Sequence, residues 1–342
     1  MPASTPTVSV LNGYDQLLAL EDEWRDLFAS TDRPQAFLRY SWLCASWEAV
    51  SRHFPDQLKV VVVRRDGRLS AACAFVLGYR RLRPVARLLG STFPQLDEVL
   101  YRPSEFARAD TVLMLRALGA DSWLPRWLEL RTLRDDSLLS EALASSEMPR
   151  QVRKTWQAVW LALDRHVSYE AYFDTLSHNL KVDHRRRMRR LGEMPGFAHV
   201  VETLHTGQHT LRWLFSAKRQ WMERQNKLSS WLESEVADRL FERLAGWGRD
   251  ESEMRIASLR VGGRIIAASL SLLERDRVKY AVMSHDPEFG QHSPGRTLTL
   301  LEIAAAFEHS AREFDLGYGD THWKLRLANL QRKVTAERIR LK

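Results

Sequence analysis

The stretch that decides the fold is Tyr280–Ser310, YAVMSHDPEFGQHSPGRTLTLLEIAAAFEHS. It begins as a strand, continues through a glycine-bearing loop and ends as a helix. Ser293 is a favoured residue immediately before a helix, and Pro294 suits the first helical position. Gly295 leaves the backbone uncovered and Arg296 adds a cation, so the N–H groups at this helix start favour an anion such as pyrophosphate. The same residues would equally serve as a plain helix cap.

Further strands and helices surround this stretch. The segment 254–286, MRIASLRVGGRIIAASLSLLERDRVKYAVMSHD, predicts three strands with turns at Gly262-Gly263 and near Asp276. After the helix, REFDLGYGD (312–320) predicts one more strand. Elsewhere, apolar residues at helical spacing predict helices and apolar runs beside turn residues predict strands. The expected helices are 14–28, 41–50, 113–118, 169–191, 211–225, 234–247 and 294–312, and the other expected strands lie in the hairpin 58–81 and at 127–133 and 159–164.

An internal repeat relates the two halves of the chain. RRDGRLSAA (64–72) aligns without a gap with RVGGRIIAA (260–268). Each copy follows helices and lies in a strand–turn–strand unit, so we favour duplication over a chance similarity of two glycine hairpins. The sequence therefore predicts an α/β (α+β) protein of two tandem domains, each a mixed, mostly antiparallel sheet flanked by helices. A polar boundary segment at 148–158 sets the expected domains at 1–152 and 153–342.

The composition limits the class of protein. The chain has 342 residues, of which 44% are hydrophobic and 27% charged, and this suits two soluble domains. A net charge of +8 favours an anionic partner such as CoA, nucleic acid, an acidic glycan or a membrane surface, although an arginine-rich surface has the same charge without such a partner. Cys44 and Cys73 lie in apolar surroundings and no cluster has metal spacing, so we expect buried thiols and no metal. With no leader and no long apolar run, we expect a cytoplasmic protein without a membrane span.

The loop that follows the three strands predicted in 254–286 resembles a known cofactor-binding loop. QHSPGRT (291–297) resembles the acyl-CoA-binding loop of GNAT-type N-acyltransferases, but departs from their usual pattern, Gln/Arg-x-x-Gly-x-Gly/Ala. The Ser-Pro-Gly form is similar to the CelD-like, BioF2-like acetyltransferase branch, which is related to the Fem peptidyltransferases. Other matching pieces are Trp42 and Trp47, the helix SHNLKVDHRRRMRRL (177–191) and the ending FDLGYGDTHWKLRL (314–327), which has a tryptophan where tyrosine is usual.

The resemblance implies a double GNAT fold in which one copy is degenerate. The N-terminal half has GSTFPQLDEVLY (90–101) in place of a glycine loop, so acyl-CoA is expected in the C-terminal copy, as a co-substrate. The strand 281–284 would pair with the pantetheine arm, and the backbone N–H groups of Ser293, Gly295 and Arg296 would hold the pyrophosphate. The residues implied to contact acetyl-CoA or another acyl-CoA are Ala281, Val282, Met283, Gln291, Ser293, Pro294, Gly295 and Arg296.

Acyl transfer to an amine would need a neutral amine, a stabilised oxyanion and a protonated leaving thiolate. His285 follows the strand and could titrate near neutral pH. Lys324 matches the branch's lysine after its Gly-Asp pair, where it could hold an anionic acceptor or donor. Each of these residues also has an ordinary interpretation, as a surface histidine, a turn aspartate or part of a basic tail. The candidate bases are His285, Asp286, Asp315 and Asp320, and the residues we assign to catalysis are His285, Asp320 and Lys324.

These features predict an acyl-CoA-dependent N-acyltransferase that acts on an amine of a small molecule, an amino sugar or a cell-envelope or exopolysaccharide precursor. One alternative is a Fem-like peptidyltransferase, in which aminoacyl-tRNA replaces CoA. The basic run 184–190 could bind that RNA or could form a solvated helix face, and nucleic acid is expected as a partner only in this alternative. The other alternative is a non-catalytic scaffold on a degenerate GNAT fold.

Overall fold

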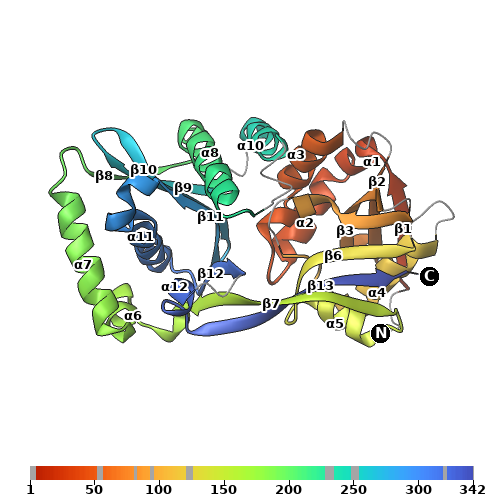
Figure 1. Cartoon of the computed structure of the whole chain (residues 1–342). Helices are drawn as coiled ribbons and strands as arrows, with labels where there is room; N and C mark the ends of the chain where they lie inside the picture. Colours follow the sequence, from red (N-terminus) through yellow and green to blue (C-terminus); the bar gives the residue numbers. More distant parts are fainter. Residues whose placement is uncertain are drawn as a thin grey trace. The chain divides into compact units, whose positions relative to one another are not determined.

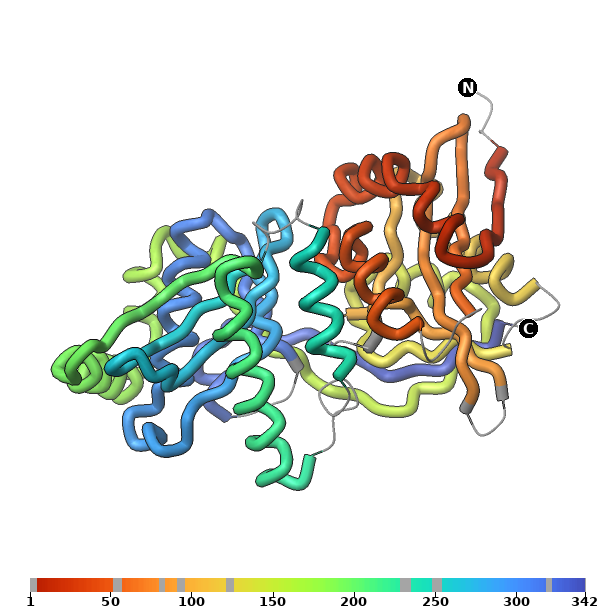
Figure 2. Tube along the Cα trace, turned by 90° about the horizontal axis from the view of Figure 1, so that it is seen from above, coloured from red at the N-terminus to blue at the C-terminus, as the bar shows by residue number. Residues whose placement is uncertain are grey.

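The computed structural model describes residues 5–51, 57–80, 83–92, 96–120, 126–227, 235–247, 254–318 and 322–341. The chain divides into two compact units, which Figures 1 and 2 trace in sequence colours. Unit 1 comprises Met1–Trp156, Glu242–Leu244 and Arg332–Lys342, and unit 2 comprises Gln157–Phe241 and Ala245–Gln331. Both have a mixed, mostly antiparallel sheet flanked by helices, which confirms the predicted fold class.

The sheet of unit 1 has the strand order β1-β2-β3-β4-β6-β13, with the short β5 beside β3. Its neighbours are antiparallel except β4 and β6, which pair in parallel. Buried side chains of α4, such as Leu115, pack with Val61 and Leu128 of the strands to form the core. The elements are β1 (Thr7–Asn12), α1 (Tyr14–Leu18), α2 (Glu21–Ser30), α3 (Tyr40–Val50), β2 (Leu58–Arg65), β3 (Arg68–Arg80), β4 (Arg83–Leu88), β5 (Leu100–Tyr101), α4 (Ala107–Ala120), β6 (Trp127–Arg134), α5 (Leu138–Ser145) and β13 (Leu330–Arg340).

The sheet of unit 2 has the strand order β7-β12-β11-β10-β9-β8. Helices α8 and α11 both pack against β10 and β11, and Figure 1 places them on opposite sides of these strands. Leu300 and Ile303 of α11 are fully buried against the sheet. The elements are β7 (Arg150–Ala162), α6 (Tyr169–Thr175), α7 (His178–Gly192), β8 (Ala198–Glu202), α8 (Gln208–Arg224), α10 (Val236–Trp247), β9 (Met254–Val261), β10 (Arg264–Glu274), β11 (Arg277–His285), α11 (Pro294–Glu308), β12 (Glu313–Tyr318) and α12 (His322–Leu325).

The predicted repeat forms the same hairpin in each unit. The strands β2 and β3 turn at Asp66-Gly67, and β9 and β10 turn at Gly262-Gly263, as the sequence predicts. Each ladder has a β-bulge that skips one residue, Ser70 in unit 1 and Ile266 in unit 2. These two residues occupy the same position of the aligned repeat. Because a bulge shifts all later side-chain pairs, its presence at one repeat position supports duplication of the whole unit.

Two segments that were each predicted to be one continuous helix form two helices in the structure. The segment 14–28 forms α1 and then α2, and 169–191 forms α6 and then α7. The second break occurs because Leu176 and Ser177 adopt extended backbone angles. Leu176 is only 7% exposed and packs with the core around Phe314, so tertiary packing overrides the helical spacing at this point.

More than half of the basic tail, residues 322–342, forms strand β13. Val334 and Ile339 of this strand are fully buried in unit 1, while charged residues alternate with them. Alternation of this kind is typical of a strand with one face on the core.

Three further observations bear on the class of protein. Cys44 and Cys73 are free and buried, as predicted. Within the described ranges, no histidine, cysteine or carboxylate residues gather in a group that could hold a metal ion. In the same ranges, every helix is too short or too polar to cross a membrane.

Candidate active site

Strands β11 and β12 of unit 2 run side by side and then part. They pair in parallel only where Arg277–Lys279 faces Glu313–Asp315. Beyond that point β11 continues along β10 to His285, whereas β12 continues towards a pairing of Tyr318 with β7. The edge of β11 from Ala281 onward therefore has no partner in β12. This edge includes the predicted donor residues Ala281, Val282 and Met283.

The loop that follows β11 forms a left-handed turn before the helix. Ser293 has a φ of 43°, and Pro294 is the first residue of α11. Ser293 is the N-cap residue of α11, as predicted, but its side chain makes no capping hydrogen bond. The Ser293 carbonyl accepts from the N–H groups of Arg296 (3.1 Å) and Thr297 (3.2 Å), and the Ser293 N–H donates to the Gly290 carbonyl (3.0 Å). Two of the three N–H groups expected to hold pyrophosphate are therefore already bonded within the chain.

Gly295 lies where the start of α11 meets the end of β11. A Cβ atom at this position would lie 2.8 Å from the Sδ of Met283 and 3.5 Å from the Nδ1 of His285. Such a contact to sulfur is too short for any side chain without movement of Met283. Glycine at this helix start therefore leaves room for the Met283 side chain at the end of β11. Three predicted site residues are brought together at this contact, while Gln291 lies on the exposed side of the loop.

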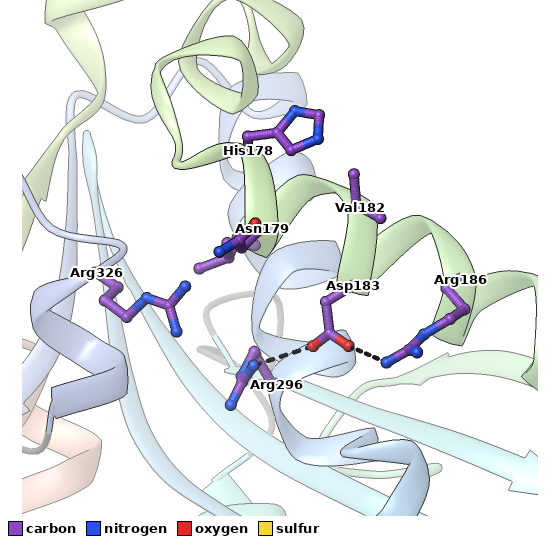
Figure 3. Close-up of a pocket in the computed structure, with 8 residues that line it drawn as sticks. His178, Asn179, Val182, Asp183, Arg186, Arg296 and Arg326 are labelled. Carbon is purple, nitrogen blue, oxygen red and sulfur yellow. Dashed lines mark hydrogen bonds and ion pairs between the residues drawn. The ribbon is translucent and has the colours of Figure 1, made fainter.

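An arginine pocket of about 490 Å³ opens beside this helix start (Figure 3). Arg296 reaches the Asp183 carboxylate (3.3 Å), which also accepts from Arg186 (2.8 Å). Arg326 donates to the Ser177 hydroxyl (3.3 Å) just before α7. Burial, and then the guanidinium of Arg187, lowers the pKa of Arg296. The pocket residues are His178, Asn179, Leu180, Val182, Asp183, Arg186, Arg296 and Arg326.

This pocket suits an anion. Three guanidinium groups line it against a single carboxylate, and the backbone N–H groups at the start of the 15-residue helix α7 add to the positive potential. The sequence predicts Arg296 as a site residue but does not indicate Arg326. The run 184–190 was interpreted either as an RNA-binding segment or as a solvated helix face, and in the structure Arg186 of this run lines the pocket and pairs with Asp183. No sequence pattern could have joined Arg326 to Arg296, because tertiary folding alone brings these distant positions together.

Lysines gather where β11 and β12 part. Lys279 and Asp315 form a buried ion pair of 2.7 Å at the last paired position of the two strands. Lys218 of α8 donates to the Met283 carbonyl (3.3 Å) on β11. The Nζ of Lys324 lies on the β12 side, 3.8 Å from where a Cβ of Gly317 would be. Burial and neighbouring lysines lower the pKa of both Lys218 and Lys324 to about 8, although Asp315 raises that of Lys324.

The predicted acid–base residues have different surroundings. His285 is half-buried at the end of β11, and burial followed by the charges of Lys218 and Arg224 lowers its pKa, so the ring is neutral at pH 7. Asp286 accepts from Arg264 and from the Glu288 N–H, which is a structural role in the loop. Asp315 is neutralised by Lys279. Asp320 lies outside the described residues.

Comparison of the sequence with protein families indicates which kind of domain contains these features. Residues 178–325 match the family model described as an acetyltransferase (GNAT) domain. Over this segment, which is less than half of the chain, the sequence is similar to GNAT acetyltransferase domains. The segment includes α7, the open edge of β11, the loop before α11, Lys218 and Lys324, and Arg326 of the pocket follows it directly. A search of curated proteins by sequence finds no match.

Solved structures extend the GNAT fold to the whole chain. FemX superposes with a TM-score of 0.65 at 9% identity, over 96% of each chain. A tandem GNAT protein from the clavulanic acid biosynthesis pathway superposes with a TM-score of 0.51 at 16% identity, over 97% of this chain and 98% of its own. The C-terminal domain of a putative lysylphosphatidylglycerol synthetase from Agrobacterium fabrum gives 0.57 at 10% identity, over 95% and 92%. The whole chain therefore has a double, Fem-like GNAT fold.

The corresponding place in unit 1 is filled by the chain itself. Strands β4 and β6 pair in parallel at Ala86 and Leu128 and then part, as β11 and β12 do in the GNAT domain. Asp97 lies alongside β6 beyond that point, where its N–H donates to the Thr132 carbonyl (3.1 Å). Its carboxylate accepts from the N–H groups of Arg131 and Thr132. The edge of β6 that faces β4 is therefore bonded to the chain's own segment.

Proposed function

We propose that this acyltransferase moves an acyl group from acyl-CoA to an amine and binds its donor in unit 2. The observation that carries the proposal is the unpaired edge of β11, which ends at Gly295 beside the arginine pocket. An extended thioester arm can add to a free strand edge through backbone hydrogen bonds. In unit 1 the matching gap between β4 and β6 contains the segment at Asp97, which bonds to β6, so we place one donor in each chain.

In this proposal the pantetheine arm lies along Ala281, Val282 and Met283. The loop of Gln291, Ser293, Pro294 and Gly295 brings the start of α11 to that edge. The diphosphate and the nucleotide phosphate lie towards Arg296 and the other arginines of the pocket, because guanidinium groups bind phosphate through paired N–H donors. The side chain of Arg296, more than its bonded N–H, is the group we expect to contact phosphate.

The chemistry needs one proton carrier. The neutral amine nitrogen attacks the thioester carbon, the C–S bond breaks, and one proton must pass from nitrogen to sulfur. His285 is neutral at pH 7 and lies at the end of the donor edge, so we propose that it accepts this proton and returns it to the departing thiolate. Lys324 is proposed to hold an anionic group of the acceptor close to this reaction. Asp320 remains a predicted catalytic residue.

The acceptor class follows from the resemblance to the CelD-like branch. We propose an amine of a small molecule, an amino sugar or a cell-envelope or exopolysaccharide precursor, modified in the cytoplasm. No metal takes part in this scheme, because the proton transfer and the charge stabilisation are assigned to His285, to Lys324 and to the backbone.

A thermal-shift series tests the donor. Acetyl-CoA or a longer acyl-CoA should raise the melting temperature, because a ligand that binds only the folded state stabilises it. Arg326→Met should weaken donor binding about tenfold, the cost of one charge-assisted hydrogen bond. Arg189→Met is the matched control, since Arg189 lies on α7, which lines the pocket, but pairs with Glu193 (3.7 Å) away from the pocket residues. Absence of a shift with every acyl-CoA would contradict the proposal.

The Fem-like alternative has one observation in its favour. The superposition with FemX covers 96% of this chain, and the arginine pocket would accept RNA phosphates as well as those of CoA. Binding of tRNA that falls steeply with salt, without any response to acyl-CoA, would favour this alternative. If neither tRNA nor acyl-CoA binds, the remaining alternative is a non-catalytic scaffold.

A further inference from the structure

The two lysines at the parting of β11 and β12 carry charge that the donor does not balance. Lys218 reaches β11 from α8, and Lys324 reaches β12 from α12. The phosphates of the proposed donor already have the arginine pocket, and a thioester has no net charge at its reacting end. Among the described residues no carboxylate is left to pair with these two ammonium groups, which favours the binding of a further anion.

The surroundings of Lys218 are cationic. Among the described residues, the charged groups that act on it are Lys324 and Lys227. Lys218 and Lys227 both lie over the ring of Trp221, at 4.3 and 4.9 Å. The single carboxylate that acts on Lys324 in the described part of the chain is Asp315, which is committed to Lys279. Half-buried like charges of this kind are costly unless a ligand compensates them.

We propose that the acceptor is an amine that also carries a carboxylate, and that Lys218 and Lys324 bind this carboxylate between them. The inference rests on the proposed function, because it takes the acyl group to lie at the same edge of β11. A carboxylate fits better than a phosphate, since two separate ammonium groups can each donate to one of its two oxygens. Bound in this way, the acceptor would present its amine next to Met283 and His285, where the thioester carbon is expected.

Protection from chemical labelling tests this site. The protein, saturated with CoA, is treated with acetic anhydride, and acetylation of each lysine is read by peptide mass spectrometry. The probes are N-acetyl derivatives of α- and ω-amino acids, which mimic the product without a reactive amine, and the matching N-acetyl amino acid amides. At least one acid should slow labelling of Lys218 and Lys324 about tenfold, and its amide should not. Lys227, exposed on the same tryptophan, is the internal control.

Variants extend the test to binding. Lys218→Met and Lys324→Met should each raise the concentration of the protecting acid needed for half protection of the remaining lysine about tenfold, whereas Lys227→Met should not. Both variants should keep the thermal response to acetyl-CoA. The inference is overturned if no acid protects either lysine, if the amides protect equally, or if N-acetylglucosamine 6-phosphate protects where the acids do not. If the protein does not respond to CoA, the proposed function is contradicted instead. In that case the same labelling experiment without CoA still shows whether the carboxylate site exists.

Discussion

At the residue scale, Gly295 illustrates what could be predicted. The sequence Ser-Pro-Gly-Arg indicated a helix start near an anion, and the structure places α11 at that position. It could not indicate that Met283 fills the space above the glycine, because that contact depends on the packing of β11 against α11. Lys218 was not predicted as a site residue for the same reason. The sequence of an amphipathic helix does not indicate which strand carbonyl one of its lysines will contact.

A substitution at Gly295 tests this packing. Gly295→Ala should lower the free energy of unfolding by about 1 kcal/mol, the low end of the cost of overpacking, because the new Cβ would lie 2.8 Å from the sulfur of Met283, whose flexible side chain can move. Adding Met283→Ala should recover most of the loss, a coupling that a double-mutant cycle in urea would measure. Gly192→Ala is the control, since a Cβ there meets no atom within 4 Å. Equal losses for Gly295→Ala with and without Met283→Ala would refute the packing argument.

At the element scale, the sequence predicted most strands and helices around the site but not where two strands part. Alternation and turn residues located β9, β10, β11 and α11. The divergence of β11 from β12 depends on which strand each one pairs with after Lys279, and periodicity contains no such information. The sequence also could not predict that the segment at Asp97 occupies the gap between β4 and β6 in unit 1. Asp97 lies in an irregular segment, and its hydrogen bonds are to strand residues that are distant in the sequence.

The segment at Asp97 gives unit 1 a pH-dependent stability. Burial raises the pKa of Asp97 to about 6 and that of Glu98 to about 7. The folded state therefore binds these protons more tightly than the unfolded chain, so their contribution is full below about pH 4 and is lost as the pH rises towards 7. The melting temperature should fall between pH 5 and pH 8, and Asp97→Asn should reduce this fall. Glu105→Gln, at an exposed position, serves as the control, and an unchanged pH profile for Asp97→Asn would contradict the assignment.

At the scale of the whole molecule, a nine-residue repeat was sufficient to predict two similar units. The shared hairpin bulge and the superpositions with double GNAT structures agree with it. The return of β13 to unit 1 could not be predicted, because Val334 pairs with Arg134, a residue 200 positions earlier. Pairing over such a separation is decided by the assembled core and not by local sequence.

The central claim is that one of the two units binds an acyl-CoA donor and the other does not. Isothermal titration of the purified protein with acetyl-CoA tests it most directly. We expect one binding site per chain, with a dissociation constant about tenfold higher in Arg326→Met and unchanged in Arg189→Met. Two sites per chain, no binding heat together with no thermal shift, or an affinity that is indifferent to Arg326 would contradict it.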